Sequence, residues 1–385
     1  MSTFDASTKQ ARYVELDSLR GLAALTVVLH HLRILWEDDT QPTSAILRSI
    51  HVFVAPIGTE AVILFFVLSG FVLSLPAVNG RPQTYTTFLI RRVFRIYVPY
   101  LAALAASVAG AFWLHGIITR SAWFHWSWSE PVSWGLVVQH LLFLGIYNDL
   151  QFDNPIWSLV HEMRISLIFP FLCAFVLRWK TRWSFLIAFG LSVSAIVLGK
   201  SIFHIPQSIT GSLHYAGIFV LGIVLAREKT GLEAWFRRRH RITKAMIGIA
   251  LLGLYLLAAP RLIAAQNYRF GHSVTLATQW IVAFASGGLM IVSMSSPWCK
   301  HILSRPPIHI LGEISYSLYL WHCVVILYCV HLLYGKMPLL PILCLAFVLS
   351  ILVSWCSYRW IEVPSMNLGR KLSNLPKRSF AKARA

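Results

Sequence analysis

The chain has 385 residues, of which 57% are hydrophobic and only 13% charged, and its mean hydropathy is +0.63. A soluble domain of this length needs more polar surface than this composition supplies, so soluble globular classes are excluded. The net charge of +19 arises from basic residues between apolar runs. That pattern is typical of membrane topology and anionic lipid, so no nucleic-acid partner is expected.

Ten apolar runs are long enough, or nearly so, to cross a bilayer as helices. They cover 19–36, 51–75, 96–115, 157–177, 184–203, 212–226, 243–259, 275–295, 309–333 and 339–360. The sequence therefore predicts an all-α polytopic membrane protein with about ten transmembrane helices. A shorter run, 132–147, is interrupted by Ser133, Gln139 and His140 and is expected to be re-entrant or interfacial.

The distribution of basic residues predicts the orientation of these helices. If the N-terminus is cytosolic, most of the 34 lysines and arginines fall on the cytosolic side, as the positive-inside rule requires. Both termini are then cytosolic. One membrane domain, 1–365, is expected to precede a basic, disordered cytosolic tail, 366–385. The six cysteines lack CxxC spacing and are interpreted as core residues, so no metal site is predicted.

The first apolar run contains Arg20 and His31, which are ionisable side chains within a predicted span. Such groups are costly within a membrane unless they pair or face a polar cavity, so they are candidates for a functional site. Their separation of eleven residues puts them within about 20° of one helix face and about 16 Å apart along the axis. Asp17 lies near the same stripe. An alternative role for Arg20 is a cytosolic anchor whose side chain snorkels.

Further polar residues recur in the later runs. Glu60 opens the second run, Glu162 and Arg164 lie in the fourth, and His322 lies inside the ninth. With the topology above, these residues are expected deep in the membrane or toward its outer face. Structural interpretations remain open, because a carboxylate near a helix N-terminus is stabilised by the macrodipole and a histidine can serve in packing.

A basic cluster, Arg91, Arg92 and Arg95, marks the cytosolic start of the third helix. Neighbouring guanidiniums bind phosphate through charge-assisted hydrogen bonds, although an ordinary positive-inside loop would look the same. A histidine can act as general base toward a hydroxyl that attacks a carbonyl. The developing oxyanion then needs a donor, for which Arg20, Arg164 or a backbone amide is a candidate.

Six short motifs follow one another along the chain. They are LDSLRGLAALTVVLHH, in which Arg20 and His31 are spaced as R-x10-H, FFVLSGF at 65–71, RRVFRIYVP at 91–99, WSLVHE at 157–162, ISYSLYLWH at 314–322 and WIEVP at 360–364. Together they resemble, in order, the motifs of acyltransferase family 3, a group of integral membrane O-acyltransferases. The resemblance covers about 15–365.

This resemblance implies a ten-helix membrane enzyme that takes an acyl group, commonly acetyl, from cytosolic acyl-CoA. The acceptor would be a hydroxyl of a carbohydrate or glycolipid at the far face of a bacterial inner membrane. Acyl-CoA is then a substrate, and no bound cofactor is expected. The segment HEMRIS, which starts at His161, differs from many relatives, which carry a second acid and an aromatic pair, so the acceptor stays open. So does formation of a homo-oligomer.

Carried onto this sequence, the resemblance implies a role for each matching residue. His31 would be the base or a transient acyl acceptor, with Arg20 and Glu162 completing the catalytic set. The phosphates of coenzyme A would face Arg91, Arg92 and Arg95. The residues expected on the acceptor side or in support of the site are Asp17, Glu60, Trp157, Arg164 and His322.

One alternative function belongs to a different class. A secondary transporter or exporter of a glycan or small metabolite would also line its path with intramembrane charges such as Arg20, His31 and Glu162. Transporters more often show an internal repeat with broken helices in matching positions, and no such repeat is evident by eye. The sequence therefore favours the enzyme.

Overall fold

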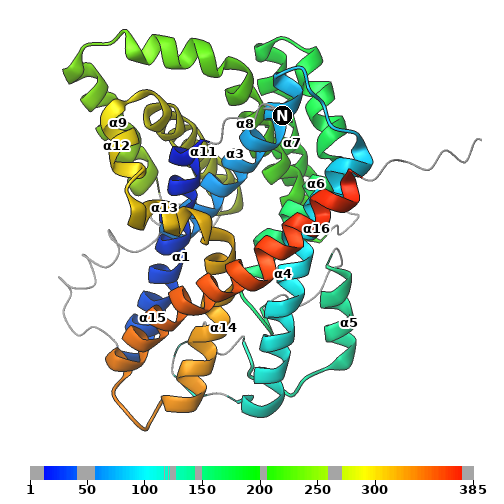
Figure 1. The fold of residues 1–385 in the computed structure, drawn as a ribbon, viewed down its shortest axis with the longest axis vertical. Helices are drawn as coiled ribbons and strands as arrows, with labels where there is room; N and C mark the ends of the chain where they lie inside the picture. Colours follow the sequence, from blue (N-terminus) through cyan, green and yellow to red (C-terminus); the bar gives the residue numbers. More distant parts are fainter. Residues whose placement is uncertain are drawn as a thin grey trace, which may run out of the picture.

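The computed structural model describes residues 13–40, 57–116, 118–119, 121, 127–143, 150–199, 206–258 and 271–374 (Figure 1). Their regular structure is helical. The helices are α1 (Val14–Thr40), α3 (Ile57–Val78), α4 (Tyr85–Leu114), α5 (Trp134–Leu142), α6 (Ile156–Arg178), α7 (Thr181–Gly199), α8 (Gln207–Arg237), α9 (Arg241–Leu257), α11 (Gly271–Ser295), α12 (Pro297–Leu303), α13 (Pro306–Glu313), α14 (Ser315–Leu333), α15 (Leu339–Ser357) and α16 (Val363–Ser373). A π-helical turn, Tyr358–Glu362, joins α15 to α16.

Nine helical segments of the described residues are long and apolar enough to cross a bilayer, which confirms an all-α, multi-pass membrane fold. They match nine of the ten predicted runs. The remaining run, 243–259, corresponds to α9, which has 17 residues. A helix of that length extends about 26 Å, short of the roughly 30 Å apolar core of a bilayer. The residues that follow it, 259–270, lie outside the described part of the chain, and the cytosolic location of the termini stays a prediction.

The run 132–147 forms only the nine-residue helix α5, with 144–149 outside the described residues. Nine residues extend about 14 Å, so α5 does not cross the membrane by itself. It lies against α4, where the Tyr100 hydroxyl donates to the His140 carbonyl at 3.1 Å. This agrees with the expectation that the segment is not a span.

The C-terminal boundary expected near residue 366 falls inside helix α16. Figure 1 shows α15 and α16 as one diagonal run that crosses α4. The Ser365 hydroxyl donates to the Phe94 carbonyl, and Gly369 packs so closely that an added Cβ would lie 2.7 Å from Phe94 Cβ. The helix that packs on α4 therefore continues to Ser373, and 375–385 lie outside the described residues.

Helices α1, α4 and α14 run in the same direction through the bundle. The Tyr316 hydroxyl donates to the Ile96 carbonyl at 2.8 Å, and further along both helices Tyr328 donates to Ala106 at 2.8 Å. On α1, Asp17 lies against Gly312, just before α14 begins, whereas His31 meets His322 deeper inside. Residue number therefore increases in the same direction along all three helices, away from the end where Asp17 lies.

Glycines let two long helices, α3 and α8, approach closely. A Cβ added to Gly70 would lie 2.1 Å from the Phe219 carbonyl oxygen, and one added to Gly222 would lie 2.3 Å from that of Val67. Small residues serve this purpose in membranes, where helix association depends on close packing. The crossing fixes α3, which forms one wall of the cavity described below.

We therefore expect Gly222→Ala to lower stability by roughly 1–3 kcal/mol, because the new methyl group overlaps the backbone of α3. The measurement is the thermal unfolding midpoint in detergent. Gly248→Ala is the matched control, since an added Cβ there meets nothing within 4 Å and helix propensity favours alanine by up to about 1 kcal/mol. Equal midpoints for the two variants would contradict this packing.

Candidate active site

A cavity of about 710 Å³ lies between α1, α3, α4, α6, α14 and α16. At one end its lining residues include Gln83 and Arg370, which are exposed, so the cavity reaches the protein surface there. At the other end the lining residues are buried, namely Val62, Ser158 and Tyr319. The cavity thus runs from the surface into the bundle.

The side chains of five arginines line this cavity. Three of the guanidiniums pair with a carboxylate: Arg20 with Asp17 at 3.3 Å, Arg92 with Glu162 at 2.7 Å, and Arg95 with Glu362 at 3.0 Å. Among the described residues, the hydrogen-bond acceptors of the other two arginines, Arg91 and Arg370, are neutral oxygens. The positive charge that is not locally neutralised therefore gathers where α4 meets α16.

The Arg92–Glu162 pair joins α4 to α6 and is supported from two sides. Ser69 on α3 donates to Glu162 at 3.2 Å, and Arg92 also donates to Ser166 Oγ at 3.1 Å. Glu162 therefore lies among the arginines, whereas the predicted topology put Glu162 and the arginines toward opposite sides of the membrane. The reason is that α6 begins inside the bundle, after the buried residues Phe152 and Asp153.

The second feature is a buried pair of imidazoles, His31 and His322. Their Nδ1 and Nε2 atoms are 2.9 Å apart, and their rings stack with centroids 5.0 Å apart. His322 Nδ1 lies 3.0 Å from the Leu318 carbonyl, which can only accept, so His322 Nδ1 donates. In neutral His322 the Nε2 atom is then an acceptor, and His31 Nδ1 must donate to it. It follows that neutral His31 carries its lone pair on Nε2.

A cysteine completes this cluster. Cys323 Sγ lies 3.3 Å from His322 Nε2 and 3.6 Å from His31 Nδ1, and the three ligand-type atoms all lie within 4.8 Å of one another. A tetrahedral metal ion accepts such spacing. Hydrogen bonds among the same three atoms explain this spacing equally well. We therefore assign no metal to the cluster.

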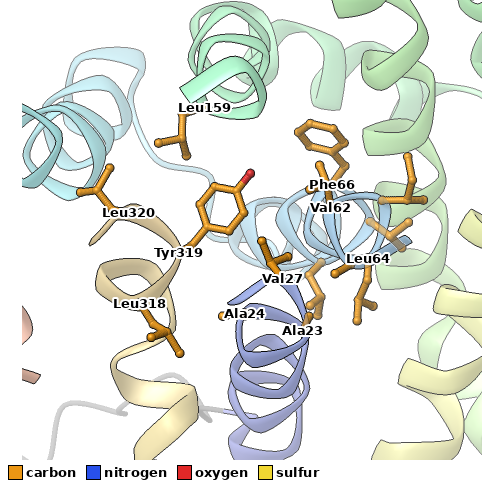
Figure 2. Close-up of a cluster of buried hydrophobic side chains, with 14 of the residues drawn as sticks. Ala23, Ala24, Val27, Val62, Leu64, Phe66, Leu159, Leu318, Tyr319 and Leu320 are labelled. Carbon is orange, nitrogen blue, oxygen red and sulfur yellow. The ribbon is translucent and has the colours of Figure 1, made fainter. Parts of the chain in front are cut away.

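Neither His31 nor His322 lines the cavity; Tyr319 and Ser158 close its inner end. The Tyr319 hydroxyl lies 2.6 Å from Ser158 Oγ, and its ring centroid is 6.1 Å from that of His322. Figure 2 shows the Tyr319 side chain between Leu159 of α6 and Val27 of α1. The Tyr319 side chain therefore lies next to both the cavity and the histidine pair.

Three of the residues selected from the sequence lie elsewhere. Glu60 is buried near the start of α3, at 1% exposure. Arg164 turns toward α8 and donates to the Ser208 carbonyl at 2.6 Å. Trp157 is half-buried on α6, with its ring 6.1 Å from that of Tyr215 on α8. Their contacts are with other helices, whereas Asp17, Arg20, Glu162 and the three arginines of α4 line the cavity.

Some residues of the site were not selected from the sequence. Tyr319 and Ser158 lie inside two of the quoted motifs. Glu362 is the only acidic residue of the sequence after Glu313, and this isolation could have identified it as a candidate. Asp153 had no such signal. It is fully buried in the loop before α6, both of its carboxylate oxygens lack a hydrogen-bond partner among the described residues, and burial raises its pKa well above the ordinary value.

Apolar spanning helices, a surface-connected cavity rich in guanidiniums and a deeper histidine pair define a multi-pass membrane protein with an intramembrane site. A family model described as an acyltransferase domain, that of acyltransferase family 3, matches residues 13–359. The chain therefore belongs to this family. No solved structure matches it.

The curated relatives are also named as acyltransferases. The O-acetyltransferase OatA of Staphylococcus aureus strain MRSA252 is 27% identical over 399 residues, which is 96% of this chain and 60% of that protein. The protein of the same name from strain NCTC 8325 / PS 47 shows the same identity and coverage. The chain thus spans about three fifths of the length of these relatives.

The pairing of Arg92 with Glu162 predicts coupled effects on stability. Their side chains are 12% and 19% exposed, so Glu162→Gln leaves a mostly buried guanidinium without its counter-charge, at a cost of roughly 1–3 kcal/mol. Arg92→Gln should cost a similar amount, and the double variant should lose less than the sum. Thermal unfolding of all four proteins in detergent gives the coupling energy, and strictly additive losses would contradict the pair.

Proposed function

We propose that this chain is a membrane O-acyltransferase that moves an acyl group, most simply acetyl, from cytosolic acyl-CoA to a hydroxyl of a carbohydrate or glycolipid. The family supports acyl transfer, and the names of the relatives support oxygen as the acceptor atom. The positive-inside pattern supports a cytosolic N-terminus, which would put the arginine-lined end of the cavity on the cytosolic side, where acyl-CoA is found.

The choice of acyl-CoA as donor rests on the distance between the arginines and the histidine pair. Arg20 lines the cavity, and His31 lies eleven residues further along the same helix, about 16 Å along the axis. The phosphopantetheine arm of acyl-CoA holds its thioester at a distance of this order from its pyrophosphate. A donor whose phosphates stay among the arginines can therefore present its thioester near Tyr319 and the histidine pair.

The tautomers derived above supply the base. His31 Nε2 takes the proton of the acceptor hydroxyl while the oxygen attacks the thioester carbonyl. His322 accepts from His31 Nδ1 throughout, which fixes the ring and favours the imidazolium that forms. The tetrahedral intermediate then expels the coenzyme A thiolate, which takes the proton from His31 Nε2. The ester and free coenzyme A result.

The oxyanion of this intermediate needs a donor near the histidines. Arg164 is turned toward α8, and Arg20 is paired with Asp17 about 16 Å away along the helix, so neither of the arginines considered from the sequence is suited to that role. We assign it to the Tyr319 hydroxyl, because Tyr319 lines the inner end of the cavity and its ring lies beside that of His322.

The acceptor would approach from the opposite side of the membrane, since the cavity reaches the surface at the arginine end. Surface polysaccharides, lipid-linked oligosaccharides and glycolipids all present hydroxyls there. A bacterial plasma membrane, which is the inner membrane where an outer one exists, fits both this arrangement and the bacterial source of the relatives. The acceptor's identity, its binding residues and formation of a homo-oligomer are left to experiment.

Replacing His31 tests the reaction itself. We expect His31→Ala to lower acetyl transfer from acetyl-CoA to membrane glycans by roughly 10²–10⁴-fold, because the base is lost. Transfer is measured with labelled acetyl-CoA in membranes that contain equal amounts of folded protein. His301→Ala, an exposed histidine on α12, is the control and should leave transfer unchanged. If purified wild type turned over no acetyl-CoA, the transporter alternative or another donor would replace this proposal.

Replacing His322 tests the tautomer argument. His322→Gln retains an acceptor for His31 Nδ1, whereas His322→Leu removes it, so we expect the leucine variant to lose at least about tenfold more activity than the glutamine variant. A purely structural role for His322 predicts the opposite order, since leucine suits an apolar, fully buried position better. The comparison uses kcat for acetyl transfer at equal thermal stability.

A further inference from the structure

The five arginines of the cavity differ in how readily their guanidiniums can bind an added anion. In Arg20, Arg92 and Arg95 the guanidinium is already held by a carboxylate at 3.3 Å or less. A phosphate that bound there would have to share or displace that carboxylate, which leaves a buried acid without its partner. These three arginines therefore build the wall of the cavity and contribute little free positive charge.

Arg91 and Arg370 differ, because among the residues the structure describes they contact only neutral groups. Arg91 donates to Ser373 Oγ and to Asn374 Oδ1, each at 3.0 Å, and Arg370 lies 3.5 Å from Asn367 Oδ1. A neutral acceptor is readily exchanged for a phosphate oxygen, which makes a stronger, charge-assisted bond. The corner between α4 and α16 is thus the anion-binding part of the cavity.

Helix α16 is held firmly enough to contribute to such a site. Gly369 lies against Phe94, and Ser365 donates to the Phe94 carbonyl, so this face of α16 is fixed on α4. Asn367 and Arg370 are three residues apart and therefore neighbours on one side of the helix, and both line the cavity. This helix follows the last residue of the family match, 359, so the family model does not describe its residues.

We infer that the corner between α4 and α16 binds the nucleotide end of the donor, with Arg370 on the ribose 3′-phosphate and Arg91 on the pyrophosphate. This rests on the proposed function, in which acyl-CoA is the donor. The order follows from geometry. Arg91 lies about one helical turn nearer the surface than Arg95, and Arg370 is exposed at the mouth of the cavity. In acyl-CoA the 3′-phosphate is likewise the anionic group furthest from the thioester.

The test compares binding of coenzyme A with binding of 3′-dephospho-coenzyme A to the purified, full-length protein in detergent, by calorimetry. The wild type should prefer coenzyme A by about 10–100-fold, the value of one charged arginine–phosphate contact. Arg370→Gln should remove this preference and leave the affinity for the dephospho form unchanged. Arg91→Gln should weaken both ligands about equally.

Lys371→Gln is the matched control, because it removes the same charge from an exposed neighbour on α16 that does not line the cavity. The Lys371→Gln protein should keep the wild-type preference for coenzyme A over the dephospho form. The Arg370→Lys protein should keep part of that preference. An Arg370→Gln protein that still prefers coenzyme A as strongly as wild type overturns the assignment of Arg370 and leaves the proposed donor intact. A wild type that binds neither ligand overturns both the site and the choice of acyl-CoA as donor.

Discussion

The requirement that a buried guanidinium has a counter-charge organises the centre of this protein. Three arginine–carboxylate pairs surround one cavity, and two of them connect segments far apart in the sequence, α4 with α6 and α4 with the π-helical turn before α16. Each pair offsets part of the cost of removing charge from water. Together they allow a polar cavity to penetrate an apolar bundle. Among the described residues, the arginines of the cavity that lack a carboxylate partner are the two at its mouth, Arg91 and Arg370.

Because α1, α4 and α14 run in the same direction, the spacing of residues along one helix can be compared directly with the spacing along the others. Arg20 and His31 on α1 and Tyr316 and His322 on α14 mark corresponding levels, and Arg91 lies further out than either pair. In the proposed reaction, phosphate binding, the acyl group and proton transfer would follow one another along this common direction. The proposed reaction, which joins a large cytosolic donor to an acceptor on the far side, would need this order.

Much of this arrangement follows from local pattern. Hydropathy predicted nine of the spanning helices, and the helical period put Arg20 and His31 on one stripe, with Arg20 lining the cavity. The pairing of Arg92 with Glu162, separated by 70 residues, could not be predicted, because it depends on α6 starting within the bundle. Nor could the partnership of His31 with His322, 291 residues away, although each was selected separately as an intramembrane histidine. Hydropathy predicts that a segment lies within the membrane, but it does not predict how far inside the bundle the helix begins.

The closed inner end of the cavity also matters for the electrical insulation of the membrane. An enzyme that serves both faces of a bilayer risks conducting ions, since a polar path that crosses completely would dissipate the proton and sodium gradients on which the cell depends. Here the polar cavity ends at Tyr319, Ser158 and the apolar side chains of Val62 and Phe65. In the proposed reaction only a neutral acyl group has to reach the far side, whereas a hydrated ion would have to shed its water to follow. The proposed acyl transfer therefore requires no continuous polar path for ions across the bilayer.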